Sequence, residues 1–236
     1  MDIPLNKFCK GCDTLLTEFN ISQAKARQGN FCWCTECVRL KSIETRLFNK
    51  IEVLTYYSKY DIPVCEICEN DDIRCLSLDH INNNGEKHRR EIKVGSGSHF
   101  YLWIKKNNYP NDFQVLCMNH QFIKAKDLLY EKIMGTKQAE ASRKSRLNKR
   151  IKSLSFYSPY NIPQCSVCDV TDLRCLSLDH KEERTGRKHR REIGNKSLYD
   201  FVIANNYPDG FQTLCMNHQF IKTINKGILC STGKCI

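Results

Sequence analysis

The sequence lacks any long hydrophobic run and is comparatively poor in acidic residues. No apolar segment approaches the roughly 18–20 residues that a membrane-spanning helix requires, and the first residues lack the apolar stretch of a secretory signal. We therefore expect an intracellular protein with no membrane partner. The 26 acidic residues are outnumbered by 37 lysines and arginines, which gives a formal net charge of +11. This balance favours a polyanionic partner.

Cysteine, in contrast, is abundant. The 15 cysteines are an odd number, and many of them form Cys-x2-Cys pairs. Such a pair can present two thiolates to one tetrahedral zinc ion, whereas disulfides are characteristic of exported proteins. We therefore predict zinc sites rather than disulfides. The pairs are Cys9/Cys12, Cys34/Cys37, Cys65/Cys68 and Cys165/Cys168.

An internal duplication organises the larger part of the chain. Residues 51–80 and 151–180 align without gaps, and both end in Arg-Cys-Leu-Ser-Leu-Asp-His. The match returns as Lys-His-Arg-Arg-Glu-Ile and closes with Phe-Gln-x-Leu-Cys-Met-Asn-His-Gln-Phe-Ile-Lys at 113–124 and 211–222. A repeat of this length predicts two copies of one folding unit.

The 236 residues allow two or three small domains rather than one large enzyme core. Residues 1–45 hold the first two cysteine pairs and predict a four-cysteine zinc finger. Copy one spans 46–130 and copy two spans 146–228. Between them, 131–145 is rich in Ala, Gln, Lys and Arg and predicts a basic helical linker. The tail at 229–236 carries no interpretable signal.

Hydrophobic patterning predicts the same elements in both copies. In copy one we expect an amphipathic helix at Leu47–Tyr57, a short strand at Cys75–His80 and a second helix at His99–Asn108. A second strand at Phe113–Cys117 then leads into a helix that starts near Asn119. Strand, loop, strand and helix form a ββα unit, so the expected fold class is α+β, built from small zinc-stabilised modules.

Each module offers four ligands for one tetrahedral zinc ion. In the copies, the Cys-x2-Cys pair is completed by a second pair in which the last residue is histidine. In the first module Cys32 could replace Cys34. Cys75 and Cys175 are also repeated, but they lie in an alternating strand pattern that predicts buried thiols. The three sets are Cys9, Cys12, Cys34 and Cys37; Cys65, Cys68, Cys117 and His120; and Cys165, Cys168, Cys215 and His218.

Two histidines at repeated positions in each copy remain outside these sets. One follows an aspartate at the end of the first expected strand. An Asp-His pair there suits metal-assisted phosphodiester hydrolysis, because the carboxylate holds a hard divalent ion and the imidazole takes a proton from the attacking water. A satisfied surface or core histidine is the alternative. These histidines are His80 and His88 in copy one, and His180 and His189 in copy two.

Three motifs follow one another in copy one: Cys-x2-Cys, then Leu-Asp-His-Ile-Asn-Asn-Asn-Gly-x-x-His-Arg, then Asn-Asn-Tyr-Pro-x-x-Phe-Gln-Val-Leu-Cys-x-Asn. Together they resemble zinc-containing HNH endonucleases of the ββα-metal class, most closely small proteins common in bacteriophages. The likeness covers each copy almost end to end. The first module is similar to the four-cysteine finger often placed ahead of such nuclease domains.

The resemblance implies roles for particular residues. The family's metal-binding acid matches Asp79 and Asp179, and its general base matches His80 and His180. Its last metal ligand, usually His or Asn, is replaced by Gln121 and Gln219. The position of the family's middle Asn is taken by Asp112 and Gly210, so we do not carry that role over.

The Lys-His-Arg-Arg segment is expected to contact phosphate, with His88 and His189 near the scissile group. A solvated charged loop is the alternative reading of this segment. Arginines there and cations of the linker are the expected phosphate ligands. They are Arg89, Arg90, Arg190, Arg191, Lys144, Arg146, Lys149 and Arg150.

The expected function is a DNA endonuclease that uses one magnesium or manganese ion per active copy, besides three structural zinc ions. The alternative is a degenerate HNH-derived zinc protein that binds nucleic acid without cleaving it. The sequence leaves RNA open as the nucleic acid and does not specify an oligomeric state. Copy one is expected to cut and copy two mainly to bind, because the loop after Asp-His is neutral at 81–85 but longer and charged at 181–186.

Overall fold

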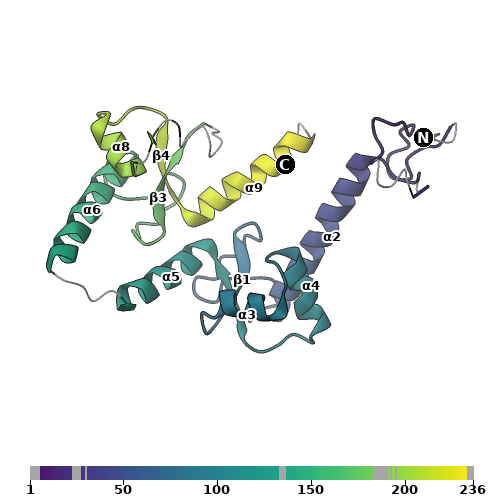
Figure 1. Cartoon of the computed structure of the whole chain (residues 1–236), viewed down its shortest axis with the longest axis horizontal. Coiled ribbons are helices and arrows are strands. Elements are labelled where there is room, and N and C mark those ends of the chain that lie inside the picture. The colour runs from purple at the N-terminus through teal and green to yellow at the C-terminus, as the bar shows by residue number, and fades with distance from the viewer. Residues whose placement is uncertain are drawn as a thin grey trace. The chain divides into compact units, whose positions relative to one another are not determined.

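The computed structural model describes residues 6–22, 28–29, 31–132, 137–182, 191, 193–194 and 196–232. These residues form seven helices and two antiparallel two-stranded sheets (Figure 1), which confirms the α+β class. The chain divides into two compact units, the first made of 1–57 and 84–112 and the second of 58–83 and 113–236. Within the described residues, no helix combines the length and apolar character needed to cross a bilayer.

The first unit is built on one long helix. α2 (Thr35–Tyr56) begins where the Cys34 thiol accepts a hydrogen bond from the Cys37 N–H, and it runs continuously through the expected module boundary at 45/46. α3 (Gly85–Ile92) and α4 (Ser98–Lys106) complete the unit, and α4 packs against α2. The Lys-His-Arg-Arg segment of copy one therefore lies in a helix, α3, rather than in a loop.

A polar network fastens α2 to the chain around α4. The Lys105 Nζ donates to Glu52 Oε2 at 2.7 Å, and the Tyr109 hydroxyl donates to Glu52 Oε1 at 2.7 Å. The Tyr109 ring stacks on Tyr56 with ring centroids 4.2 Å apart. Before α2, the core of the N-terminal segment is very small: Leu16 and Ile21 are its buried aliphatic residues, and they pack beside cysteines.

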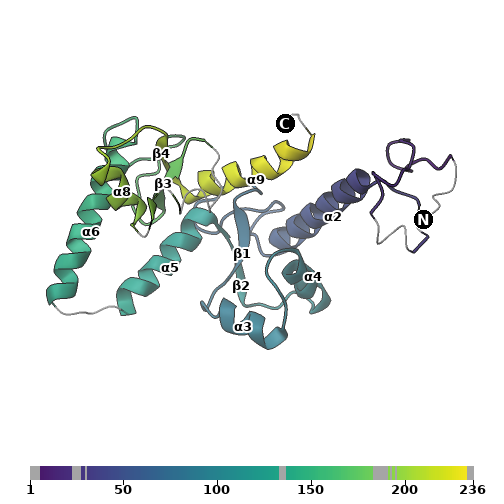
Figure 2. The same cartoon turned by 45° about the horizontal axis from the view of Figure 1, so that its top comes forward.

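The second unit contains the same hairpin twice. In copy one, β1 (Leu76–His80) pairs with β2 (Phe113–Cys117), and α5 (Met118–Lys132) follows β2 directly (Figure 2). In copy two, β3 (Leu176–His180) pairs with β4 (Phe211–Cys215) in the same register, and α9 (Met216–Thr232) follows. The predicted strand-strand-helix order is confirmed in both copies.

In copy two, α8 (Leu198–Ala204) packs against α6 (Lys137–Phe156), and α6 packs against both strands of the hairpin. Its buried aliphatic and aromatic core is small, and two metal-type cysteines belong to it. The core residues are Leu154, Leu176, Leu178, Val202, Phe211 and Leu214, with Cys165 and Cys215. A core of this size makes additional stabilisation by a bound metal physically reasonable.

Candidate metal centres and Asp-His sites

Three clusters of four side chains each are arranged to hold a metal ion. In every cluster, one sulfur or nitrogen atom from each residue lies within 4.8 Å of the other three. No disulfide joins the described cysteines. The members are Cys9, Cys12, Cys34 and Cys37 (the N-terminal cluster); Cys65, Cys68, Cys117 and His120 (the copy-one cluster); and Cys165, Cys168, Cys215 and His218 (the copy-two cluster).

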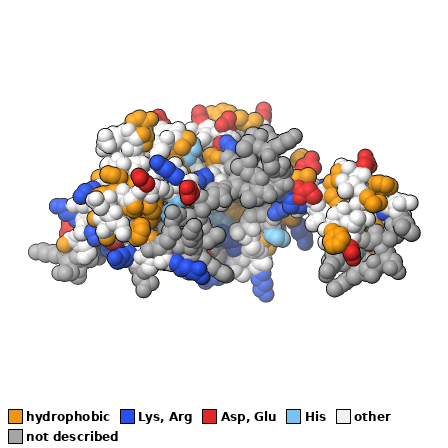
Figure 3. Space-filling model, turned by 90° about the horizontal axis from the view of Figure 1, so that it is seen from above, with side chains coloured by type: hydrophobic (Ala, Val, Ile, Leu, Met, Phe, Trp, Pro, Cys, Tyr) orange, Lys and Arg blue, Asp and Glu red, His pale blue; other side chains and the backbone are white. Residues whose placement is uncertain are grey.

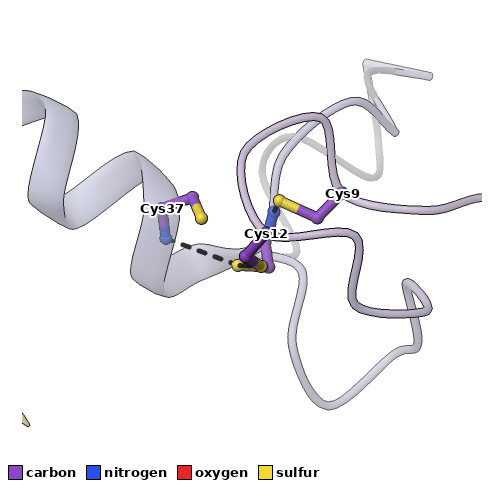
Figure 4. Close-up of side chains that lie close together, drawn as sticks. Cys9, Cys12 and Cys37 are labelled. Atoms are coloured by element: carbon purple, nitrogen blue, oxygen red, sulfur yellow. Dashed lines mark hydrogen bonds between the residues drawn. The ribbon is translucent and has the colours of Figure 1, made fainter.

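These are the three predicted sets, and Cys34 rather than Cys32 is the member of the first. Figure 4 shows Cys37 on α2 and Cys9 and Cys12 on the preceding loop, with their side chains brought together. The loop passes so close to Trp33 that a Cβ at Gly11 would lie 2.6 Å from its ring. Only glycine fits this turn without a shift.

Backbone N–H groups point at the sulfur atoms of the N-terminal cluster. The Cys34 N–H donates to Cys9 Sγ at 3.2 Å and the Gly11 N–H at 3.4 Å. Burial disfavours the Cys9 thiolate, but these two hydrogen bonds and the side-chain hydrogen bonds with Cys34 and Cys37 together outweigh it, and the pKa of Cys9 falls to about 6. A thiolate is the form that binds metal.

The spacing in the copies matches a tetrahedral ion. Ligands bound to zinc at about 2.0–2.3 Å lie roughly 3.5–3.8 Å from one another. In copy one, Cys68 Sγ is 3.9 Å from Cys117 Sγ, and His120 Nδ1 is 3.4 Å from Cys65 Sγ. In copy two the Sγ atoms of Cys168 and Cys215 are also 3.9 Å apart. Three sulfurs and one imidazole nitrogen form a donor set typical of zinc.

Two thiols of each copy shift each other's pKa in opposite directions. The hydrogen bond with Cys117 lowers the pKa of Cys65 to about 4, and the same contact raises the pKa of Cys117. Cys165 and Cys215 behave identically. A bound cation would favour the thiolate form of all three sulfurs of a cluster.

Cys75 and Cys175 lie outside the clusters, as predicted for buried thiols. The Cys75 thiol donates to Asn70 Oδ1 at 3.2 Å and to the Asp72 carbonyl at 3.4 Å. Burial raises the pKa of Cys175 to about 11, which keeps that side chain a thiol.

The Asp-His pair lies at the end of the first strand of each hairpin, where the chain leaves for the connection to the second strand, and it is bound to a lysine. In copy one, Lys124 Nζ lies 2.5 Å from Asp79 Oδ2 and donates to the His80 carbonyl at 2.7 Å. Gln114, opposite Asp79 in the strand register, donates to the same carboxylate at 2.8 Å. Side-chain exposure is only 20% for Lys124 and 21% for Asp79, so solvent screens this ion pair weakly.

Copy two repeats this arrangement with equivalent residues. Lys222 contacts the Asp179 carboxylate and the His180 carbonyl, and Gln212 donates to Asp179 at 3.1 Å. Because the contact recurs in both hairpins, it is a property of the folding unit. The lysine was missed in the sequence, although it occurs at the same place in both closing motifs.

The glutamines expected as metal ligands contact the hairpin. Gln121 donates through Nε2 to Ser77 Oγ, and Gln219 donates to Ser177 Oγ at 2.5 Å. Within the described part of the chain, Asp79 and Asp179 belong to no group of three or more metal-type ligands. The hairpin alone thus offers an aspartate and a backbone carbonyl to a cation.

The histidine rings pack against aromatic side chains. His80 is 6% exposed and meets Phe113 edge-on, with ring centroids 4.7 Å apart, and His180 lies 4.6 Å from Phe211. His88 belongs to the first unit and packs edge-on against Trp103 at 5.1 Å. Its equivalent His189 lies outside the described residues, as does Arg190.

Several of the expected phosphate ligands have protein partners. Arg90 pairs with Glu86 on α3, and Lys149 pairs with Asp200 at 2.7 Å. Arg150 donates to the Leu176 carbonyl at 2.6 Å and to the Leu173 carbonyl, so it connects α6 to the hairpin. Arg191, Lys144 and Arg146 are exposed. Lysine and arginine side chains recur across the face drawn in Figure 3.

Comparison with protein-family models, with curated proteins and with solved structures returned no match.

Proposed function

We propose that the protein is an HNH-type endonuclease that hydrolyses phosphodiester bonds in DNA with the aid of a divalent cation. The observation that carries the proposal is the cation contact at each Asp-His pair: a carboxylate oxygen and a carbonyl oxygen together hold an ammonium group at the strand end. Zinc in the three clusters would hold the small modules together.

The donor atoms at this site suit a hard divalent ion. Magnesium and manganese prefer carboxylate and carbonyl oxygens, and Asp79 Oδ2 and the His80 carbonyl already hold the positive charge of Lys124. Asp79 is therefore the residue that would hold the ion. Gln121, the other expected ligand, lies one helical turn before Lys124. When bound, such an ion supplies Lewis-acid stabilisation of the negative charge that develops on phosphate.

His80 is the proposed general base. It follows Asp79 directly, and its ring is fixed against Phe113. An imidazole fixed in this way is suited to take a proton from the attacking water. In copy two, His180 and Phe211 provide the same pair of rings.

Lys124 also supports a second candidate, a nucleic-acid-binding protein that does not cleave. An ammonium group on the carboxylate competes directly with a divalent ion, and the contact is present in both copies. In this case the hairpins present positive charge and zinc-stabilised surfaces to the nucleic acid without chemistry.

A plasmid-nicking assay over a range of magnesium and manganese concentrations separates the two candidates. The wild-type protein should nick DNA, and His80→Ala should abolish nicking while leaving DNA affinity nearly unchanged. Lys124→Met removes the competing cation, so half-maximal nicking should need less magnesium. Lys59→Met is the matched control, because Lys59 also pairs with a carboxylate of the same copy, Glu66, but is 64% exposed.

Absence of nicking by both the wild-type protein and Lys124→Met, in preparations that bind DNA, would establish the second candidate. The same assay with RNA decides which nucleic acid is the substrate. Comparison of His80→Ala with His180→Ala identifies the active copy. We expect His80→Ala to be the inactive variant, because charged residues follow His180 and misplacement of reacting groups by about 1 Å can cost about 100-fold in rate.

A further inference from the structure

An open groove runs along one face of α2 and ends at the start of α4. Its volume is about 590 Å³, and all of its lining residues belong to the first unit. Several α2 side chains on its floor are three or four residues apart, so they share one face of the helix. They are Val38, Ser42, Thr45 and Asn49. α4, which packs against α2 (Figure 1), contributes to the other wall. None of the lining residues is among the phosphate ligands expected from the sequence.

Cations border the groove, and no carboxylate lines it among the described residues. Lys41 and Arg46 of α2 and His99 of α4 are all exposed. The Lys41 Nζ lies over the Trp33 ring, 4.7 Å from its centroid, so a cation–π contact places this charge at the groove wall. The Arg46 Nε donates to the Ser42 carbonyl at 3.0 Å. The terminal amino groups of that guanidinium have no partner in the described part of the chain and are available to an anion.

Asn49 adds a buried donor near the α4 end of the groove. Only 8% of this residue is exposed, although it lines the groove. Its Oδ1 accepts a hydrogen bond from Lys105 Nζ at 2.9 Å, whereas its amide nitrogen has no acceptor among the residues that the structure describes. Because polar groups this deeply buried are ordinarily hydrogen-bonded, the amide nitrogen is suited to a ligand that brings an oxygen atom into the groove.

The corresponding helices of copy two border a second cationic groove. It has a volume of about 510 Å³, lies between α6 and α8, and is lined by Lys144, Lys149 and Lys152. Extension of the ungapped repeat alignment by two residues places Lys149 opposite Asn49. Lys149 also pairs with Asp200 at 2.7 Å, so the copy-two groove carries one partly neutralised charge. Positive charge along the same pair of helices is therefore a property of the repeated unit.

We propose that the α2–α4 groove binds the phosphate backbone of DNA, as a contact formed by residues other than those of the Asp-His sites. Phosphate oxygens accept hydrogen bonds from ammonium, guanidinium, hydroxyl and amide donors, and the groove offers all four. The α2 face from Val38 to Asn49 is about 16 Å long at about 1.5 Å per residue. A strand of duplex DNA carries one phosphate per about 3.4 Å of its axis, so this face can contact more than one.

A long polyanion fits these observations better than a short acidic peptide does. The formal net charge of the chain is +11, and the cationic groove recurs in copy two. The inference rests on the DNA partner of the proposed function and not on cleavage.

The test is DNA binding by the full-length protein without added magnesium or manganese, so that cleavage plays no part. Affinity for a fluorescein-labelled duplex is measured by anisotropy over a range of salt concentrations. Lys41→Gln combined with Arg46→Gln should weaken binding and flatten the slope of log K against log salt by about 1.8, at about 0.9 per lost phosphate contact. Lys10→Gln combined with Lys106→Gln is the matched control and should keep the wild-type slope. Both control lysines are exposed, belong to the first unit and do not line the groove.

Trp33 fluorescence gives a second measurement that does not depend on the charge variants. The chain has two tryptophans, Trp33 and Trp103. Trp103→Phe leaves Trp33 as the only one, and copy two has phenylalanine at the equivalent position, Phe201. The emission of Trp33 should change as DNA saturates this protein, because phosphate in the groove draws the Lys41 ammonium from the ring. Unchanged emission at saturation would overturn the proposal.

The remaining outcomes separate the groove from the proposed function. An unchanged slope in the Lys41→Gln, Arg46→Gln protein, or equal flattening in the control, overturns the groove as a DNA contact while leaving the proposed function in place. The same change of Trp33 emission with polyglutamate as with DNA identifies an acidic-peptide site and also overturns the proposal. Absence of DNA binding by the wild-type protein overturns both inferences. The expected change of slope in a protein that does not nick DNA supports the groove and refutes only the nuclease.

Discussion

Two buried hydroxyl groups in copy two should respond to removal with opposite signs. Thr213 on β4 is fully buried, and its Oγ1 donates to the Leu154 carbonyl at 2.8 Å. Leu154 lies in the last turn of α6, where carbonyls lack partners within the helix. Thr213→Val preserves shape but leaves that buried carbonyl unpaired, which costs about 1–3 kcal/mol.

Ser153 lies beside Leu154 and is also fully buried. Its hydroxyl has no hydrogen-bond partner among the described residues. Ser153→Ala removes an unpaired polar group and introduces a better helix former, so we expect stabilisation of about 0.5–1 kcal/mol. Opposite signs of the two changes in stability are a stronger test than the size of either change.

Native-state hydrogen exchange of β3 and β4 measures both changes locally. A loss of 1–3 kcal/mol corresponds to about 5- to 140-fold faster exchange wherever opening is at equilibrium. Thr213→Val should accelerate exchange by a factor in this range, and Ser153→Ala should slow it. Unchanged exchange in Thr213→Val, or accelerated exchange in Ser153→Ala, would refute the reasoning. The peptides of β1 and β2 serve as the control.

Three further predictions concern metal, salt and acid. Elemental analysis of the purified protein should give about three zinc ions per chain, in line with its three clusters, and a folded chain with a ratio near one would contradict the sites in both copies. DNA affinity should fall steeply with salt, and Lys144→Gln with Arg146→Gln should flatten the slope by about 0.9 per lost phosphate contact; an unchanged slope would exclude these cations from the interface. Hydrogen bonds from Lys105 and Tyr109 lower the pKa of Glu52, so its contribution to stability is present above the unfolded pKa of about 4.3 and is lost as pH falls through the lower folded value. Glu52→Gln should therefore reduce the acid sensitivity of tryptophan fluorescence in this window, and a full wild-type transition in the variant would contradict that assignment.

The sequence was most informative where a repeat and a fixed chemical spacing coincided. Phe113–Cys117 forms a strand with the predicted bounds, because alternating side chains and a cysteine at its end restrict the register. The zinc sets could be predicted because a separation of two residues lets both side chains of a pair reach one metal ion. Cys75 was excluded from these sets by its place in the strand pattern, and the structure confirms this.

Contacts between elements were less predictable. The start of α2 at Thr35 extends the expected helix by twelve residues, because polar residues with fair helix propensity continue the turn once the Cys34 cap is in place. The sequence around Lys124 does not indicate that this lysine pairs with Asp79, because a lysine on a helix is ordinarily solvated. Hydrogen bonds between Asn119 and Asn217 join the two copies. The sequence pattern of one copy does not indicate how that copy packs against the other.

The metal clusters and the Asp-His pairs are not independent sites, because one short helix segment serves both. Cys117 ends β2, and His120 in the first turn of α5 completes the copy-one cluster. The next residue, Gln121, contacts Ser77 on β1, and Lys124, three residues further on and thus on the same helix face, contacts Asp79. A metal ion that fixes the junction of β2 and α5 therefore also fixes the distance between Lys124 and the Asp79 carboxylate. Metal bound to the copy-one cluster would therefore act on the electrostatic state of the residues proposed for chemistry.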